Sequence, residues 1–194
     1  MSPDGTRLAY VKLGEPTGAQ IFVRYMDAEG AVTQITRLES GPGGLAWSPD
    51  GKWIAYTSTV PEAPQWSTAV PGKPAGATWA AEPKVVDRLQ YRSDWAGYVD
   101  AGHSQVFVVS ASGGTPTQLT EGPWNHGQLS WAKDGREILF SSLRVEKAEY
   151  QWRESEIYAV NVATRAVRQL TSRNKEVQYL EGELQRLKAQ REQQ

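Results

Sequence analysis

Residues able to carry acid–base, nucleophilic or metal chemistry are few and scattered in this sequence. The two histidines, His103 and His126, lack the spacing of a zinc motif, and no cysteine is present to ligate a metal or act as a thiolate nucleophile. The Gly-x-Ser-x-Gly motif that carries the serine nucleophile of an α/β-hydrolase is also absent from the sequence. The sequence therefore predicts no catalytic residue, no metal site and no cofactor site.

Two pairs of acidic residues and one glycine-rich segment are the remaining candidates for chemistry. Carboxylates paired as Glu154 with Glu156, or Asp94 with Asp100, are able in principle to exchange protons, but exposed loop carboxylates are far commoner, so we interpret them as solvated charges. Residues 40–44 are rich in glycine but precede a predicted strand and lack lysine. We interpret this segment as a turn and not as a phosphate-binding loop.

The composition indicates a globular chain built from strands. Lys and Arg total 21 against 22 Asp and Glu, so no strong field recruits nucleic acid or an anionic membrane, and no apolar run is long enough to span a bilayer. Eight Trp, eight Tyr, 18 Gly and 11 Pro favour strands and tight turns over a helical bundle. Five tryptophans fall in predicted loops, where they either line a channel or, as we prefer, cover apolar sheet edges: Trp66, Trp79, Trp95, Trp124 and Trp152.

A hairpin signature occurs three times, in residues 2–11, 48–57 and 132–141. In each copy a turn with Asp followed by Gly leads into a strand of aliphatic and aromatic residues. These turn residues are Asp4 and Gly5, Asp50 and Gly51, and Asp134 and Gly135. A second hairpin recurs out of phase, from Gln20, Gln105 and Glu156 to a Gln-Ile-Thr or Gln-Leu-Thr end.

Together the two hairpins define a four-stranded unit, which predicts an all-β fold, a partial β-propeller of two to three blades. The first two Asp-Gly turns lie one blade length apart, whereas the interval to the third is almost twice as long. The excess indicates a long insertion between strands near 59–103, a segment interrupted by prolines. An ordinary β-sandwich with similar hairpins is the alternative fold.

The composition changes after residue 174. Residues 175–194 contain no Pro and consist mainly of Glu, Gln, Arg, Lys and Leu, which predicts a C-terminal amphipathic helix after a propeller domain at 1–174. A heptad stripe suggests a short coiled coil and self-association, although a frayed or artificial appendage is an equal alternative. The stripe consists of Val177, Leu180, Leu184 and Leu187.

The segment 88–98 and the two motifs that follow it, 103–109 and 113–120, give the chain a family resemblance. It resembles the propeller of bacterial acylaminoacyl peptidases and dipeptidyl aminopeptidases of the prolyl oligopeptidase superfamily, and its hairpins are similar to those of TolB-type propellers. The resemblance covers roughly residues 2–174. It implies a propeller that sits over an α/β-hydrolase domain and restricts entry to short peptides.

The catalytic Ser, Asp and His of that family belong to the hydrolase domain and cannot be mapped onto this chain. The resemblance therefore predicts a non-catalytic part of a serine peptidase, with the α/β-hydrolase domain and short peptides as partners. A non-enzymatic scaffold that binds peptides or proteins is the alternative function. We also expect a cytoplasmic location and a natural N-terminus that lies upstream of Met1.

Overall fold

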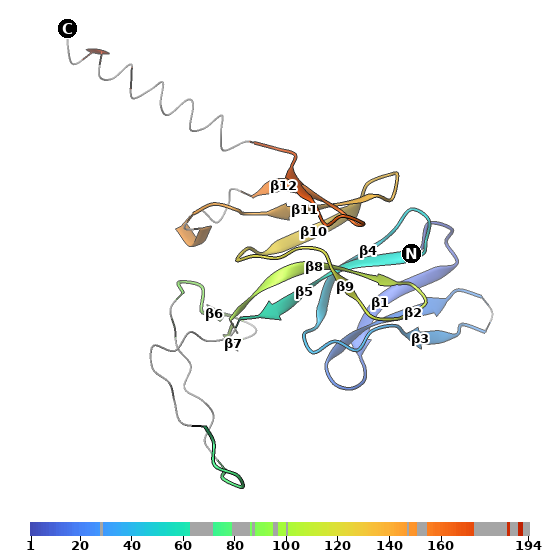
Figure 1. Cartoon of the computed structure of the whole chain (residues 1–194). Coiled ribbons are helices and arrows are strands. Elements are labelled where there is room, and N and C mark those ends of the chain that lie inside the picture. Colours follow the sequence, from blue (N-terminus) through green and yellow to red (C-terminus); the bar gives the residue numbers. More distant parts are fainter. Residues whose placement is uncertain are drawn as a thin grey trace.

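The described strands form four antiparallel sheets: three larger sheets that lie side by side in chain order and one two-stranded hairpin (Figure 1). A computed structural model describes residues 1–27, 29–62, 72–78, 86, 88–94, 97–99, 101–146, 148–150, 155–172, 186 and 190–191. The first sheet consists of β1 (Arg7–Leu13), β2 (Ala19–Tyr25) and β3 (Val32–Gln34), in that order. The all-β character predicted from the composition is confirmed for this part of the chain.

The second and third sheets have four strands each and follow one plan. The second consists of β4 (Pro42–Trp47), β5 (Trp53–Pro61), β8 (Gly102–Ser110) and β9 (Thr117–Gln118). The third consists of β10 (His126–Trp131), β11 (Glu137–Ser142), β12 (Glu156–Asn161) and β13 (Val167–Gln169). Both first strands carry a bulge at the same place, where Gly44 and Gln128 have positive φ.

Short elements lie in the two long connections, which leave the sheets at the same end. The hairpin of β6 (Arg92–Ser93) and β7 (Gly97–Tyr98) interrupts the connection between β5 and β8. The 3-10 helix η1 (Ala148–Tyr150) lies between β11 and β12. Strand β5 pairs directly with β8 along its whole length, so the predicted insertion is accommodated without disturbing the second sheet.

Two apolar cores hold neighbouring sheets together. One core joins the first and second sheets through residues such as Ile21, Ile54 and Tyr56, all fully buried. The other core joins the second and third sheets through residues such as Ala55 and Phe140. Because successive side chains of β5 point to opposite faces, this strand contributes to both cores.

In each of the three larger sheets a hydrogen bond joins the Gln or Glu of one strand to a Thr that follows the last strand, and this recurring bond, which we call the polar lock, explains the repeated Gln and Thr of the sequence. In the second sheet the Thr120 hydroxyl donates to Gln105 Oε1 at 2.8 Å and accepts from the Val106 amide at 2.9 Å, with all three residues buried. Equivalent pairs occur as Gln20 with Thr36 and as Glu156 with Thr171. A buried polar group needs such partners, so each lock fixes the register of its outer hairpin.

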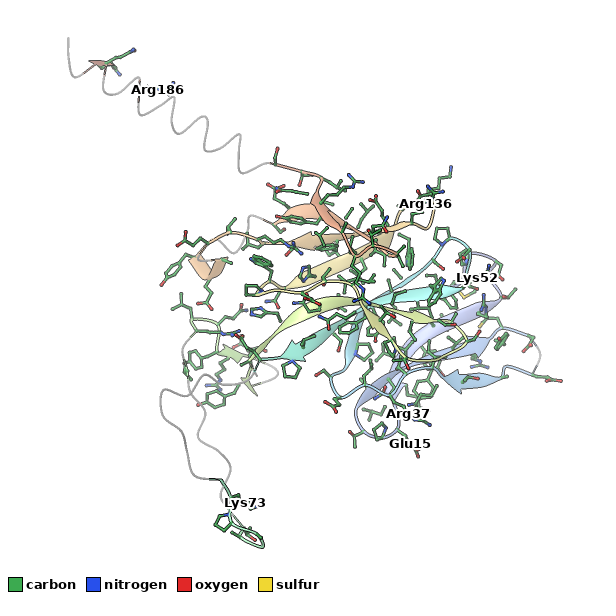
Figure 2. All side chains as sticks on the ribbon, in the orientation of Figure 1. Glu15, Arg37, Lys52, Lys73, Arg136 and Arg186 are labelled. Atoms are coloured by element: carbon green, nitrogen blue, oxygen red, sulfur yellow. The ribbon has the colours of Figure 1, made fainter. Side chains whose placement is uncertain are left out.

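The Asp-Gly turns lie at the ends of the sheets opposite the long connections, the rim on which Figure 2 labels Lys52 and Arg136. Asp4 and Asp50 each accept a hydrogen bond from a serine hydroxyl two residues earlier, which holds the pKa of both carboxyls below the usual value. Gly5, Gly51 and Gly135 all have φ between 66° and 73°. The six turn residues therefore shape backbone and do not converge on a shared site.

The turn glycines provide a matched comparison, because Gly5 faces open space while Gly51 touches the first sheet. A Cβ at Gly51 would lie 3.0 Å from Arg7 Nη2, and this guanidinium donates to the Gly51 carbonyl at 2.7 Å. We expect Gly5→Ala to cost about 1 kcal/mol through backbone strain, and Gly51→Ala to cost about 1 kcal/mol more because Arg7 must move. Urea titration of both variants measures the difference, and equal losses would contradict the proposed contact.

The predicted C-terminal helix and coiled coil are not confirmed. Val177, Leu180, Leu184 and Leu187 lie outside the described residues. The described residues of this segment, Arg186, Gln190 and Arg191, have helical backbone, but no α-helix is among the elements that the structure describes. Self-association likewise stays a prediction. So does the count of two to three blades, since the first of the three sheets has only three described strands.

Candidate functional site

Charged and aromatic side chains gather where the long connections leave the second and third sheets. We call this end the long-loop rim and define it by Glu62, Arg88, His103, His126 and Arg144. Glu62 directly follows β5, and His103 lies at the start of β8. His126 begins β10, and Arg144 follows the end of β11. The rim therefore draws its residues from two adjacent sheets.

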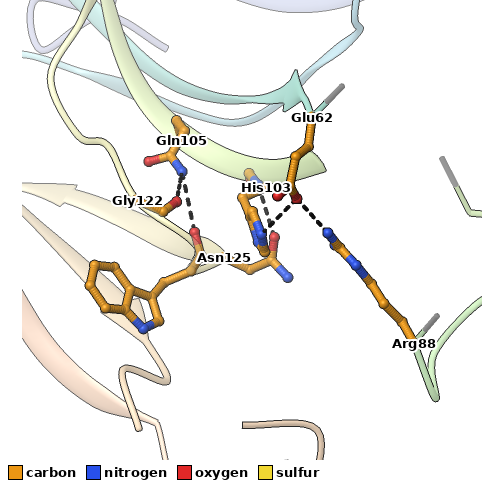
Figure 3. A network of polar contacts seen from close by, with 8 residues as sticks. Glu62, Arg88, His103, Gln105, Gly122 and Asn125 are labelled. Atoms are coloured by element: carbon orange, nitrogen blue, oxygen red, sulfur yellow. Dashed lines mark hydrogen bonds and ion pairs between the residues drawn. The ribbon is translucent and has the colours of Figure 1, made fainter. Parts of the chain in front are cut away.

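Glu62, Arg88 and His103 form one polar group within the second sheet's connection (Figure 3). The Arg88 guanidinium donates to Glu62 Oε2, and His103 Nε2 lies 3.6 Å from the same oxygen. His103 Nδ1 is buried without a hydrogen-bond partner. Burial and the neighbouring Arg88 lower the pKa of His103, while Glu62 opposes that shift, so this imidazole is neutral near pH 7.

His126 connects the second sheet to the third. Its Nδ1 lies 2.8 Å from the Ser104 carbonyl, its Nε2 lies 2.8 Å from Arg144 Nη2, and its ring packs on Phe140 at 4.8 Å between centroids. Burial lowers its pKa to about 4. A neutral ring with the proton on Nδ1 satisfies both contacts, because Nδ1 then donates to the carbonyl and Nε2 accepts from the guanidinium.

A second set of bonds crosses the same boundary and positions the loop before β10. The Ser104 amide donates to Asn125 Oδ1 at 2.8 Å, and Gln105 Nε2 donates to the carbonyls of Gly122 and Trp124 (Figure 3). A Cβ at Gly122 would lie 2.6 Å from the Trp124 ring, so only glycine lets that ring pack here. Gln105 and Gly122 thus fix where Trp124 stands.

Arg144 lies among aromatic rings. Its guanidinium carbon is 4.9 Å from the Trp124 ring centroid, 5.6 Å from that of Phe140 and 4.8 Å from that of Tyr158. Its Nε is buried and has no hydrogen-bond partner, and the residue as a whole is half-buried. The site is thus a cation held by one histidine and three ring faces.

The pairing of Ser104 with His126 does not constitute a nucleophile and its base. The Ser104 hydroxyl donates to the His126 main-chain carbonyl at 3.1 Å and not to the imidazole. Both ring nitrogens of His126 are already engaged by the Ser104 carbonyl and Arg144. Among the described residues no group of three or more His, Cys, Asp or Glu is arranged to hold a metal. The described groups of the rim are therefore arranged for neither proton transfer nor nucleophilic attack.

The other residues singled out from the sequence lie apart from one another. Glu156 belongs to the polar lock of the third sheet, and Asp94 lies in the turn between β6 and β7. Their expected partners, Glu154 and Asp100, lie outside the described residues, as do Trp66, Trp79, Trp95 and Trp152. Of the five loop tryptophans, Trp124 alone falls in the described part of the chain, and it packs on Arg144 as well as on Gly122.

Solved structures decide the fold class. The chain matches TolB from Acinetobacter baumannii with a TM-score of 0.51 at 17% identity, over 88% of this chain and 31% of that one. It matches the acylaminoacyl peptidase of Pyrococcus horikoshii with a TM-score of 0.57 at 14% identity, over 88% of this chain and 24% of that one. The fold is a TolB-like β-propeller. The match to propellers contradicts the sandwich alternative, whereas the number of blades stays a prediction.

A sequence relative connects this propeller with peptidases. The chain is 29% identical over 142 residues to an uncharacterized peptidase, YuxL, of Bacillus subtilis (strain 168), across 73% of this chain. The match spans 21% of that relative. No family model matches the chain. The predicted resemblance to peptidase propellers is confirmed.

Sequence reasoning missed the central residue of the rim, Arg144. It stands after a strand with no motif around it, and its partners come from β10, β12 and the loop before β10. His126 was considered only as a zinc ligand, for which its spacing is wrong. Among the helices of the described part of the propeller, none is long and apolar enough to cross a membrane.

Proposed function

We propose that this propeller is the non-catalytic part of a serine peptidase and that it selects short peptides for an α/β-hydrolase domain. The observation that carries the proposal is the 29% identity to a peptidase over 142 residues, together with a fold shared with acylaminoacyl peptidase. Each matched protein is much longer than this chain. A separate catalytic domain is therefore part of the proposal, and so is a cytoplasmic location.

The long-loop rim supplies the contacts for this role. It combines a carboxylate, Glu62, with two guanidiniums, Arg88 and Arg144, and with the half-buried indole of Trp124. A peptide carries one positive and one negative terminus and apolar side chains, and this combination complements all three. The opposite rim offers mainly backbone turns, so we place peptide binding at the long-loop rim.

The purified chain is expected to bind short peptides and to leave them intact. Incubation with acetyl-alanine p-nitroanilide and Ala-Ala p-nitroanilide should release no nitroaniline, because the described residues hold no serine activated by a base. Fluorescence anisotropy with a labelled tripeptide should show binding that Glu62→Ala weakens at least about fivefold. Asp134→Ala, on the opposite rim, is the matched control and should bind like the wild type.

Two outcomes would reject this function. Turnover that follows the chain through stringent purification would show that it is catalytic in its own right. Binding of folded proteins but of no peptide up to about ten residues would instead favour the scaffold role. Peptide binding without turnover, lost at the long-loop rim alone, is the result that supports the proposal.

A further inference from the structure

The guanidinium of Arg144 has no anionic partner among the residues that the structure describes. It contacts the neutral imidazole of His126 at 2.8 Å and the faces of three aromatic rings. Among the described residues no carboxylate lies within ion-pair distance of it. Its Nε is buried and donates to nothing. A half-buried cation is therefore left uncompensated on the long-loop rim.

Three other arginines of the described chain donate to oxygen atoms. Arg7 donates to the Gly51 carbonyl at 2.7 Å, Arg88 pairs with Glu62, and Arg168 donates to both carboxylate oxygens of Glu137 at 3.1 and 2.7 Å. A buried donor without an acceptor destabilises the folded state, and more so when it is charged. Because Nε is buried, an oxygen acceptor from outside the chain would have to reach Arg144 at its Nη atoms, of which Nη2 contacts only the His126 ring nitrogen among the described residues.

The surroundings hold the Arg144 guanidinium in place and strengthen any ion pair that it forms. The neutral His126 ring accepts a hydrogen bond from Arg144 Nη2, which holds the guanidinium in position without neutralising its positive charge. The three rings cover its faces, and this burial lowers the pKa of Arg144 from its ordinary value. Charges that meet in such a setting attract more strongly than in bulk water, and guanidinium is matched to carboxylate by its planar pair of donors.

The neighbours of Arg144 indicate what the carboxylate is attached to. Trp124 is half-buried, so one part of the indole stays accessible beside the guanidinium. Glu62 and Arg88 lie on the same rim, within the connection of the adjacent sheet. An apolar surface next to a cation suits the last residue of a peptide, whose side chain and terminal carboxylate leave the same carbon atom.

We propose that Arg144 binds a carboxylate, and specifically the C-terminal carboxylate of a short peptide whose last side chain packs against Trp124. The inference rests on the proposed function, since it names the group by which the propeller recognises its peptides. It assigns Arg144 and Trp124 to ligand contact. His126 is a positioning residue, because it acts through Arg144.

The test compares three peptides on the whole chain by isothermal titration calorimetry. The probes are acetyl-Ala-Ala-Phe with a free carboxylate, the same peptide as its amide, and acetyl-Ala-Glu-Phe amide, which carries only a side-chain carboxylate. We expect the free acid to bind at least tenfold more tightly than either amide. Arg144→Gln should remove this preference, whereas Arg168→Gln, an exposed arginine paired with Glu137, should retain it.

A spectroscopic readout separates ligand contact from a purely structural role. In protein labelled with nitrogen-15 at arginine, the Arg144 Nε–H resonance should shift on addition of the free acid and stay in place with the amide or with inorganic phosphate at the same concentration. Arg144→Lys keeps the charge and should retain part of the preference. It also covers the case in which Arg144→Gln fails to fold.

Three results of the peptide comparison would contradict the Arg144 site. Equal affinity of the wild type for acid and amide overturns the Arg144 site while leaving peptide selection intact. Preference for the Glu-containing amide over the free acid replaces a terminal with a side-chain carboxylate and also overturns the proposal as stated. Binding of none of the three acetylated peptides, while unacetylated Ala-Ala-Phe still binds, overturns the Arg144 site alone; binding of neither overturns the site and the proposed function together.

Discussion

Phe140→Ala is expected to lower the free energy of unfolding by about 4 kcal/mol, near the upper range for a core substitution. The Phe140 side chain is 1% exposed and lies at the centre of the core between the second and third sheets. It stacks on Tyr158 at 5.8 Å and packs on the His126 ring at 4.8 Å. Its removal therefore takes away apolar burial and one wall beside Arg144.

Urea titration followed by tryptophan fluorescence measures this loss. Tyr150→Ala removes an aromatic ring that is 71% exposed and should change stability by less than about 0.5 kcal/mol. Phe140→Leu retains most of the volume and should cost about 1 kcal/mol. A loss below about 1 kcal/mol for Phe140→Ala would mean that the second and third sheets do not share the described core.

Acidification is the second large effect, because His126 is buried in its neutral form. The ordinary histidine pKa of 6.5 applies to the unfolded chain, whereas burial lowers the pKa of folded His126 to about 4. Between these two values the unfolded state binds more protons, so stability rises with pH and is lost as pH falls from 6.5 to 4. The full loss is on the order of 3 kcal/mol.

The variant that tests this dependence is His126→Gln, which keeps a donor and an acceptor but does not titrate. Its stability in urea, measured at half-unit steps from pH 7 to pH 4, should vary far less than that of the wild type. His103→Gln is the matched control and should keep most of the slope, because the lowering of the His103 pKa is smaller and partly opposed by Glu62. A wild-type slope in His126→Gln would assign the acid sensitivity to other groups.

Local sequence signals predicted the strands well because they depend on near neighbours. The Asp-Gly turns combine a side-chain hydrogen bond with a positive-φ glycine, and both are properties of a few adjacent residues. The recurring Gln and Thr pointed to a second hairpin. The bond between Gln105 and Thr120, however, crosses between strands and was not predictable as a contact.

The long-loop rim was beyond sequence reasoning because it forms where two sheets meet. Arg144 gains its surroundings from Trp124, His126 and Tyr158, and their positions depend on how the third sheet packs on the second. The separation of these residues along the sequence does not reveal how the two sheets pack. The heptad stripe predicted in the C-terminal segment has a clear pattern in the sequence. That pattern alone does not establish which surface, if any, packs against the stripe.

The dual role of β5 has a consequence for how the molecule loses its structure. Ile54 and Tyr56 belong to one core and Ala55 to the other, and neither core contains residues from both outer sheets. Detaching an outer sheet therefore exposes a single interface, whereas opening the middle sheet breaks both at once. We therefore expect unfolding to begin at one of the outer sheets and the second sheet to unfold last.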